Sequence, residues 1–126
     1  MTAWTNDELS KIGPAEELEI ATVRSDGELR KPVTIWVVRV GDALYARSVN
    51  GRSGSWFRGA QDRHEGRIEA GGVQRDVVLT EVDVGDDVND EIDAAYRSKY
   101  RGYAASIVNS VLTSQARAAT LKAEPR

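Results

Sequence analysis

The chain has 126 residues, of which 40% are hydrophobic and 29% charged, and it carries a net charge of −3, so we expect residues 1–126 to form a single domain with a real core. The acidic balance argues against a general nucleic-acid binder, and the absence of cysteine excludes disulfide and thiolate chemistry. Neither a signal peptide nor an apolar run of the ~18 residues that a membrane span needs is found, so a cytoplasmic protein is expected.

The first element that the sequence predicts is a short helix. Thr5 and Glu8 have the spacing of a capping box, in which each side chain binds a backbone amide of the other residue. Gly13 and Pro14 end the helix, because proline cannot continue it.

Three strands are predicted next, over residues 18–24, 30–40 and 43–48. The first alternates apolar and polar residues, and the second is rich in β-branched and aromatic residues. Asp26-Gly27 between them is a strong hairpin signal. The three segments are therefore expected to form an antiparallel meander.

The stretch RSVNGRSGSWFRGAQ, residues 47–61, is basic in an acidic chain. Its glycines permit a tight loop, its arginines can make forked hydrogen bonds to phosphate, and a short helix beginning near Ser55 and Trp56 would offer free amides. Two interpretations remain open at this point. The stretch is either an anion site or a solvated hairpin loop.

The remaining chain predicts two more strands, over 66–72 and 73–83, then a helix over 86–100, a weaker helix over roughly 103–118, and a short last strand before Pro125. This makes six short antiparallel strands with helices beside them. Such an order of elements predicts an α+β fold built on a small barrel.

Several kinds of catalytic site are disfavoured by the residue inventory. A zinc site needs several nitrogen or sulfur ligands, and the chain has one histidine and no cysteine. A serine-protease-like triad could use only His64, which lies in a very hydrophilic segment and is expected on an exposed turn. No Walker loop and no GxGxxG motif occurs. No metal site is therefore predicted.

A series of short motifs, in a fixed order, resembles a known superfamily. They are RSDGELRKPVTIWVVRVGDALYARS, GRSGSW, GRIEAGG, DAAYRSKY and ATLKAEPR, and the likeness covers about residues 4–125. The chain resembles the flavin-binding split barrels, the pyridoxamine-phosphate-oxidase-like superfamily, and within it short uncharacterised bacterial proteins near the deazaflavin-dependent nitroreductases. The resemblance implies a six-stranded antiparallel split β-barrel with flanking helices, in a homodimer with cofactor sites at the seam.

The same resemblance nominates cofactor-binding residues. In these proteins the cofactor phosphate is held by the end of the strand before the basic loop and by the loop itself. The corresponding residues of this sequence are Arg47, Ser48, Gly51, Arg52 and Ser53, with Trp56 opening the following helix and Arg30 and Lys31 near the cofactor. The flavin oxidases usually have lysine after the loop serine, where this chain has Gly54.

The resemblance implies an oxidoreductase that binds FMN or a deazaflavin coenzyme and acts on a small-molecule substrate. The ring of the cofactor would carry the hydride chemistry, so no catalytic acid or base is predicted. Two alternatives remain: a non-catalytic ligand-binding or sensor module, and a structural dimer that has lost the cofactor.

Three aromatic residues near the end of the predicted helix 86–100 invite a choice between packing and function. Tyr96 and Tyr100 are four residues apart and share one helix face, which predicts packing. The alternative is that Tyr100 or Tyr103 lines a substrate pocket. Trp36, in the second strand, is expected in the core or at an interface.

Overall fold

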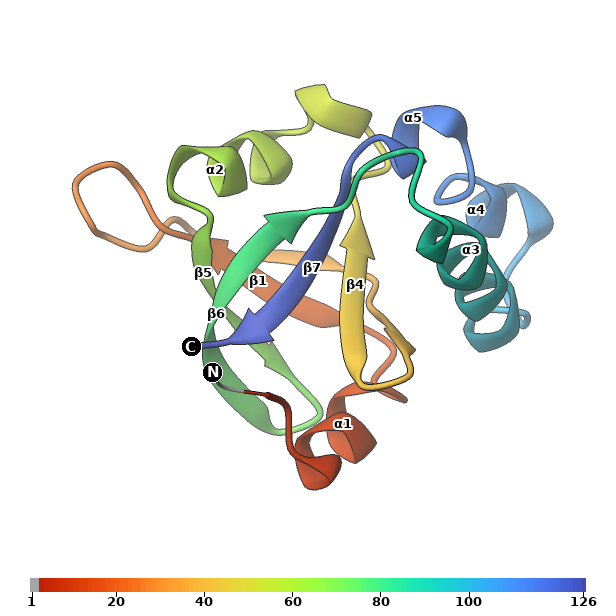
Figure 1. The fold of residues 1–126 in the computed structure, drawn as a ribbon, viewed down its shortest axis with the longest axis horizontal. Helices are drawn as coiled ribbons and strands as arrows, with labels where there is room; N and C mark the ends of the chain where they lie inside the picture. The colour runs from red at the N-terminus through yellow and green to blue at the C-terminus, as the bar shows by residue number, and fades with distance from the viewer. Residues whose placement is uncertain (1–2) are drawn as a thin grey trace.

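Seven antiparallel strands form one curved sheet in the order β2-β1-β5-β6-β7-β4-β3 (Figure 1). The computed structural model describes residues 3–126. The strands are β1 (Leu18–Thr22), β2 (Val33–Ile35), β3 (Val38–Val40), β4 (Ala43–Arg47), β5 (Glu65–Ala70), β6 (Val73–Glu81) and β7 (Thr120–Pro125). The predicted α+β class is confirmed.

The count of seven strands corrects the predicted six, and a single break explains the difference. The predicted strand 30–40 is interrupted at Trp36 and Val37, so that β2 pairs with β1 while β3 pairs with β4. The two end strands of the sheet are therefore consecutive in the chain, and the sheet closes on itself through this two-residue link. One barrel strand is bent, and its two halves pair with different neighbouring strands.

The end of the helix α3 (Val88–Lys99) satisfies the backbone at this break. The Val37 amide donates to the Tyr100 hydroxyl at 3.4 Å, and the Val37 carbonyl accepts from Lys99 Nζ at 2.5 Å. Buried peptide groups that leave a strand ladder need such substitutes. Lys99 and Tyr100 therefore hold the bent strand in place.

The other helices are α1 (Asn6–Ile12), α2 (Ser55–Arg63), α4 (Ala105–Asn109) and α5 (Ser114–Arg117), with a 3₁₀ turn over Gly51–Ser53. The predicted capping box of α1 is confirmed, with Thr5 and Glu8 binding each other's amides. The predicted single helix 103–118 is wrong, because Thr113 caps a separate helix by accepting from the Ala116 amide. The helix α2 begins at Ser55, as the sequence predicted, and its cap residue is Gly54.

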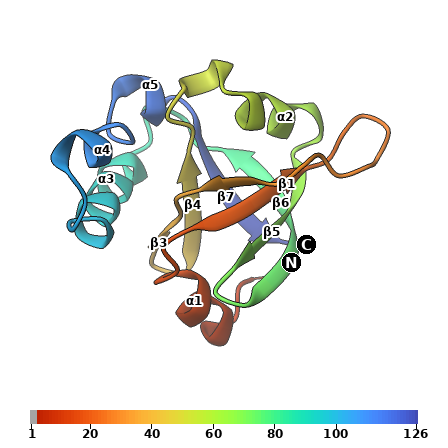
Figure 2. The same ribbon diagram turned by 180° about the vertical axis from the view of Figure 1, so that it is seen from behind.

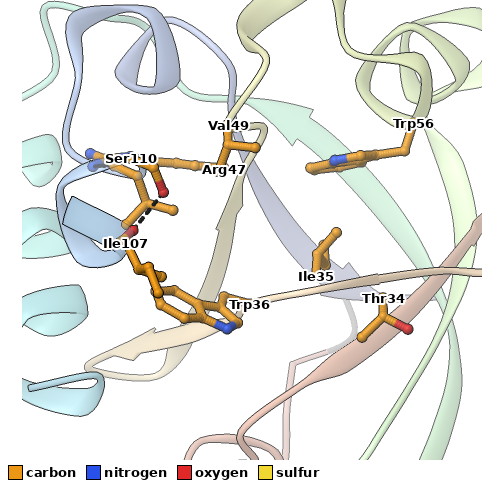
Figure 3. Close-up of a pocket in the computed structure, with 9 residues that line it drawn as sticks. Thr34, Ile35, Trp36, Arg47, Val49, Trp56, Ile107 and Ser110 are labelled. Carbon is orange, nitrogen blue, oxygen red and sulfur yellow. Dashed lines mark hydrogen bonds between the residues drawn. The ribbon is translucent and has the colours of Figure 1, made fainter. Parts of the chain in front are cut away.

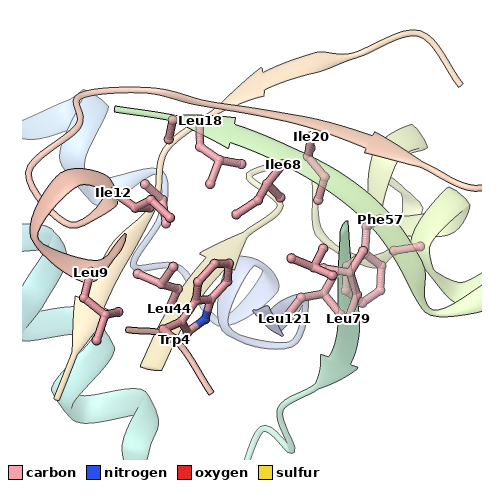
Figure 4. Packing of buried hydrophobic residues seen from close by; sticks show 14 of the residues in the cluster. Trp4, Leu9, Ile12, Leu18, Ile20, Leu44, Phe57, Ile68, Leu79 and Leu121 are labelled. Carbon is pink, nitrogen blue, oxygen red and sulfur yellow. The ribbon is translucent and has the colours of Figure 1, made fainter. Parts of the chain in front are cut away.

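The two short helices α1 and α2 lie at opposite ends of the barrel, and α3 to α5 gather on one side of it (Figures 1 and 2). Side chains from both ends meet in the barrel interior, including Leu9 and Ile12 of α1 and Phe57 of α2 (Figure 4). A second apolar cluster joins α3 to the outer face of β3 and β4, and Tyr96 and Tyr100 are fully buried in it, as the packing interpretation predicted. Among residues 3–126, every helix is too short or too polar to cross a lipid bilayer.

Candidate functional site

A groove opens where the bent strand leaves its neighbour. The register pairs Val38 with Tyr45, so an unbroken strand would place Trp36 opposite Arg47. The chain turns toward β1 instead, and the gap becomes a groove of about 300 Å³. Its lining residues are Thr34, Ile35, Trp36, Arg47, Val49, Trp56, Ile107, Ser110 and Val111 (Figure 3).

The walls of the groove are mainly apolar and include two tryptophans on opposite sides (Figure 3). Trp36 is stacked on Tyr100, with ring centroids 3.7 Å apart and planes within 3°. Trp56, in the first turn of α2, is half-buried and packs against the barrel core. Rigid aromatic walls of this kind favour a flat, apolar ring as the ligand.

Arg47 reaches the groove only with its stem, and its guanidinium group points away from the groove (Figure 3). Its Nη1 donates to the Asp93 carboxylate and to the Val111 carbonyl at 2.9 Å. Its Nη2 donates to the Asn89 carbonyl and side chain, both at 3.1 Å, and its Nε donates to Thr120 Oγ1 at 3.1 Å. All five guanidinium donors thus have protein acceptors, and Arg47 ties the helical side of the molecule to the barrel.

Arg52 points in a different direction, toward β6 and the end of α5. Its Nη1 donates to Glu81 Oε1 at 2.8 Å and to the Ala118 carbonyl at 3.0 Å. Burial works to raise the pKa of Glu81, but hydrogen bonds from Arg52 and Gln61 outweigh it, so that this pKa lies below its usual range. Arg52 and Glu81 therefore form a partly exposed ion pair.

Arg30 lies on a third side, against the outer face of α2. Its Nη2 pairs with Asp62 at 2.6 Å, and its Nη1 donates to the Val23 and Gly59 carbonyls at 3.0 and 3.3 Å. The guanidinium groups of Arg30, Arg47 and Arg52 thus do not meet at one point. Their role as phosphate contacts stays a prediction, and each would have to exchange a protein partner for a ligand.

The loop between β4 and α2 is ordered by hydrogen bonds within it and by one to the residue that precedes β7. The Ser48 amide donates to the Ala119 carbonyl, the Gly51 amide to the Ser48 carbonyl, and the Ser53 hydroxyl to the Asn50 carbonyl. Gly51 has φ +70°, and a Cβ there would lie 2.4 Å from the Gln115 side chain. These contacts hold the loop in one conformation, which positions Trp56 at the groove.

A polar pocket on another side of α2 was not anticipated. It is lined by Arg30, Ser55, Arg58, Gly59, Gln61 and Asp62 and has a volume of about 360 Å³. Arg58 is exposed, and within residues 3–126 it has no ion-pair partner. Gly54, the cap of α2, offers no side chain to the first helix amides. The signal was present in the sequence, since Ser55 and Arg58 lie three residues apart in a first helical turn.

The part of the chain that the structure describes contains no group of three or more side chains that could hold a metal ion. His64 ends α2 in a left-handed conformation with φ 55°, and its Nδ1 lies 3.2 Å from the Leu79 carbonyl oxygen. It does not line the groove.

Several solved structures resemble this fold. Among them are HutZ, the heme storage protein from Vibrio cholerae (TM-score 0.67, 13% identity, 89% of this chain and 82% of that chain), an F420 reductase (0.58, 16%, 94% and 92%), and a putative pyridoxamine 5′-phosphate oxidase from Listeria innocua (0.59, 10%, 88% and 84%). At these identities the likeness concerns the fold alone, which is a split barrel.

No curated protein sequence matches the chain significantly. Residues 8–123 do match a family that is described as an uncharacterized protein conserved in bacteria, DUF2255. The chain, a split barrel with an aromatic groove at the bend of its broken strand, belongs to this bacterial family.

Proposed function

We propose that the chain binds FMN or a deazaflavin coenzyme in the groove between Trp36 and Trp56, and that it is an oxidoreductase acting through hydride transfer. The observation that carries this proposal is the groove itself. It lies at the bend of the barrel strand, its volume is within the range of small-molecule sites, and its walls are apolar and aromatic.

Among the residues present, the groove fits a flavin better than a heme. Heme iron is held by an axial histidine, cysteine, methionine or tyrosine, and no such residue is among those that line the groove. The single histidine is bound to Leu79 at the far end of α2. A ring that needs stacking rather than iron ligation is therefore favoured.

We place the phosphate of the cofactor beside the first turn of α2. This turn has amides without a side-chain cap, and Ser55 and Arg58 lie beside it. A helix start of this kind favours an anion. Arg30, Arg52 and the Ser48–Ser53 loop are proposed to surround it, with their present partners partly displaced.

The contribution of the chain to the reaction is positioning. A bound flavin or deazaflavin ring supplies the hydride chemistry. Trp36 and Trp56 would fix the plane of the ring, while Val49 and Ile107 would exclude water from it. Because Arg47 is the only ionisable residue of the lining and its donors are engaged, we propose no catalytic acid or base.

We further propose that a second copy of the chain covers the groove in a homodimer. Val49 and Ile107, at its rim, are 49% and 48% exposed, and Val33 on the adjoining strand is 38% exposed. Apolar side chains gathered at a rim of this kind favour burial against a partner.

The test is a titration of the purified protein with FMN and, separately, with the deazaflavin coenzyme, followed by ligand absorption and tryptophan fluorescence. Arg58→Glu should raise the Kd at least about tenfold, because it replaces a cation by an anion at the phosphate, a change of about 1.4 kcal/mol or more. The control is Arg97→Glu, which reverses a charge on an exposed residue of α3.

Binding that is unchanged in Arg58→Glu would contradict the placement of the phosphate. Failure of the unmodified protein to bind either cofactor would contradict the proposal as a whole and favour a non-catalytic or structural role. Binding without reduction of the ring by NADPH or another hydride donor would favour a sensor.

A further inference from the structure

Four aromatic rings form a continuous cluster that begins at the wall of the groove. Trp36 stacks on Tyr100 at 3.7 Å and meets Tyr103 edge-on at 5.0 Å. Tyr100 in turn lies 5.8 Å from Tyr103 and 6.1 Å from Tyr96. Trp and Tyr are the side chains most easily oxidised by one electron, so contacts this close allow an electron to pass among them.

The surroundings of each ring decide where an oxidised side chain would be most stable. The Arg47 guanidinium lies 5.7 Å from the centre of the Tyr96 ring, and Lys99 Nζ lies 5.2 Å from that of Tyr100. A nearby cation disfavours a second positive charge. The Tyr100 hydroxyl donates to the Glu16 backbone carbonyl at 2.7 Å, which is too weak a base to accept its proton.

Tyr103 has the opposite surroundings. It is 38% exposed, and its hydroxyl donates to the Glu16 carboxylate. That hydrogen bond and the negative charge of Glu16 raise the pKa of Tyr103, so the phenol keeps its proton in the resting state. A carboxylate in this position can accept the proton when the ring loses an electron.

We propose that Trp36 and Tyr103 form a one-electron relay between the groove and the surface of the molecule. A one-electron oxidant in the groove takes one electron from Trp36. Tyr103 returns one electron to the indole, and its phenolic proton passes to the Glu16 carboxylate. The net change is one electron gained by the oxidant, one electron and one proton lost by Tyr103, and one proton gained by Glu16.

The chemical class that the relay serves is a one-electron oxidant bound against Trp36, such as an oxidised flavin in its photoexcited state. In this sense the relay depends on the proposed cofactor site for its use. The side chains that form the relay all belong to this chain, so the relay can be tested with no cofactor present.

The experiment is pulse radiolysis of the unmodified protein with azide radicals, which oxidise indole. We expect the tryptophanyl absorption to decay while tyrosyl absorption rises, at a rate that does not depend on protein concentration. Tyr103→Phe should remove most of the tyrosyl signal and prolong the tryptophanyl signal several-fold. Because Tyr103 is exposed, this variant should fold normally, which circular dichroism checks.

Two further variants separate the relay from general oxidation of aromatic residues. Glu16→Gln should slow the conversion several-fold while leaving every ring in place, because the proton acceptor is lost. Trp56→Phe, the control, changes the other groove tryptophan and should leave the conversion rate unchanged.

Conversion that is as fast in Tyr103→Phe or Glu16→Gln as in the unmodified protein would overturn the relay. Conversion that is lost in these variants, in a protein that binds no flavin, would support the relay while contradicting the proposed cofactor. The two proposals can therefore fail separately.

Discussion

Arg47 shows how far the role of one residue depends on where its donors point. The sequence predicts Arg47 as a phosphate contact, yet its guanidinium is buried with acceptors from α3, from the segment before α5 and from β7. A buried charge is tolerated while all its hydrogen-bond partners are present, and removing one partner destabilises the folded chain. Arg47 is therefore a structural residue of this conformation.

Arg47→Met should lower the free energy of unfolding by about 3–5 kcal/mol, because it removes the hydrogen-bonded partner of the Asp93 carboxylate and leaves that carboxylate with the more distant Arg117 Nε, at 4.0 Å. The measurement is urea denaturation followed by circular dichroism. Adding Asp93→Leu to this variant should recover part of the loss, since both charges are then gone. A loss below about 1 kcal/mol would show that Arg47 is free enough to serve a ligand.

At the scale of elements, the turn between β5 and β6 is fitted against the end of α1. Gly71 has φ +57°, and a Cβ added there would lie 2.1 Å from the Lys11 carbonyl oxygen. The neighbouring Gly72 also has a positive φ, +85°, but a Cβ there would meet nothing within 4 Å. Gly71 is needed both for its positive φ and because a side chain there would clash with Lys11. Gly72 is needed for its positive φ alone.

Gly71→Ala should therefore lower the free energy of unfolding by more than about 2 kcal/mol, because conformational strain adds to a clash with backbone. Gly72→Ala, the matched control, should lower it by only about 1 kcal/mol. Thermal and urea unfolding of both variants measure the difference. Equal losses would mean that α1 moves aside without penalty and is not firmly docked.

At the scale of the whole molecule, Lys99 gives stability a pH dependence of known sign. Burial lowers the pKa of Lys99 to about 8 in the folded chain, below the ordinary value for lysine. Between these values the unfolded chain binds a proton that the folded chain does not, so stability rises with pH. Burial also raises the pKa of Tyr96 and of Tyr100, which reverses the trend once unfolded tyrosine ionises.

The free energy of unfolding should accordingly rise by about 1 kcal/mol from about pH 8 to about pH 9.5, after allowance for partial exposure of the amine. Lys99→Met should abolish this rise, and Lys11→Met, at an exposed lysine, should leave it unchanged. Urea denaturation at several pH values measures both. A rise that persists in Lys99→Met would assign it to another group.

Local patterns were enough to predict most of the fold. The capping box at Thr5, the Asp26-Gly27 turn and the alternation in the strands are properties of short segments, and their order indicated the barrel. The break at Trp36 and Val37 was missed because nothing local marks it. The break is stabilised by hydrogen bonds between the Val37 peptide groups and Lys99 and Tyr100, which lie at the end of α3, more than fifty residues later in the chain.

The candidate site was less predictable for the same reason. The stretch 47–61 borders the groove through Arg47, Val49 and Trp56, while its role as an anion site stays a prediction. Which arginine is free depends on partners far away in sequence, such as Glu81 for Arg52 and Asp62 for Arg30. Composition counts the cations of a loop, but only the fold shows which of them are already paired.

The position of β7 in the sheet has a consequence for how the chain is made. This strand, at the end of the described chain, lies between β6 and β4 and pairs with both. During synthesis on the ribosome, β4 and β6 each have an unpaired edge until residues 120–125 emerge. Unpaired strand edges favour association between nascent chains. Completion of the barrel therefore has to wait for residues 120–125, and the interval before they emerge is when a chaperone would matter most.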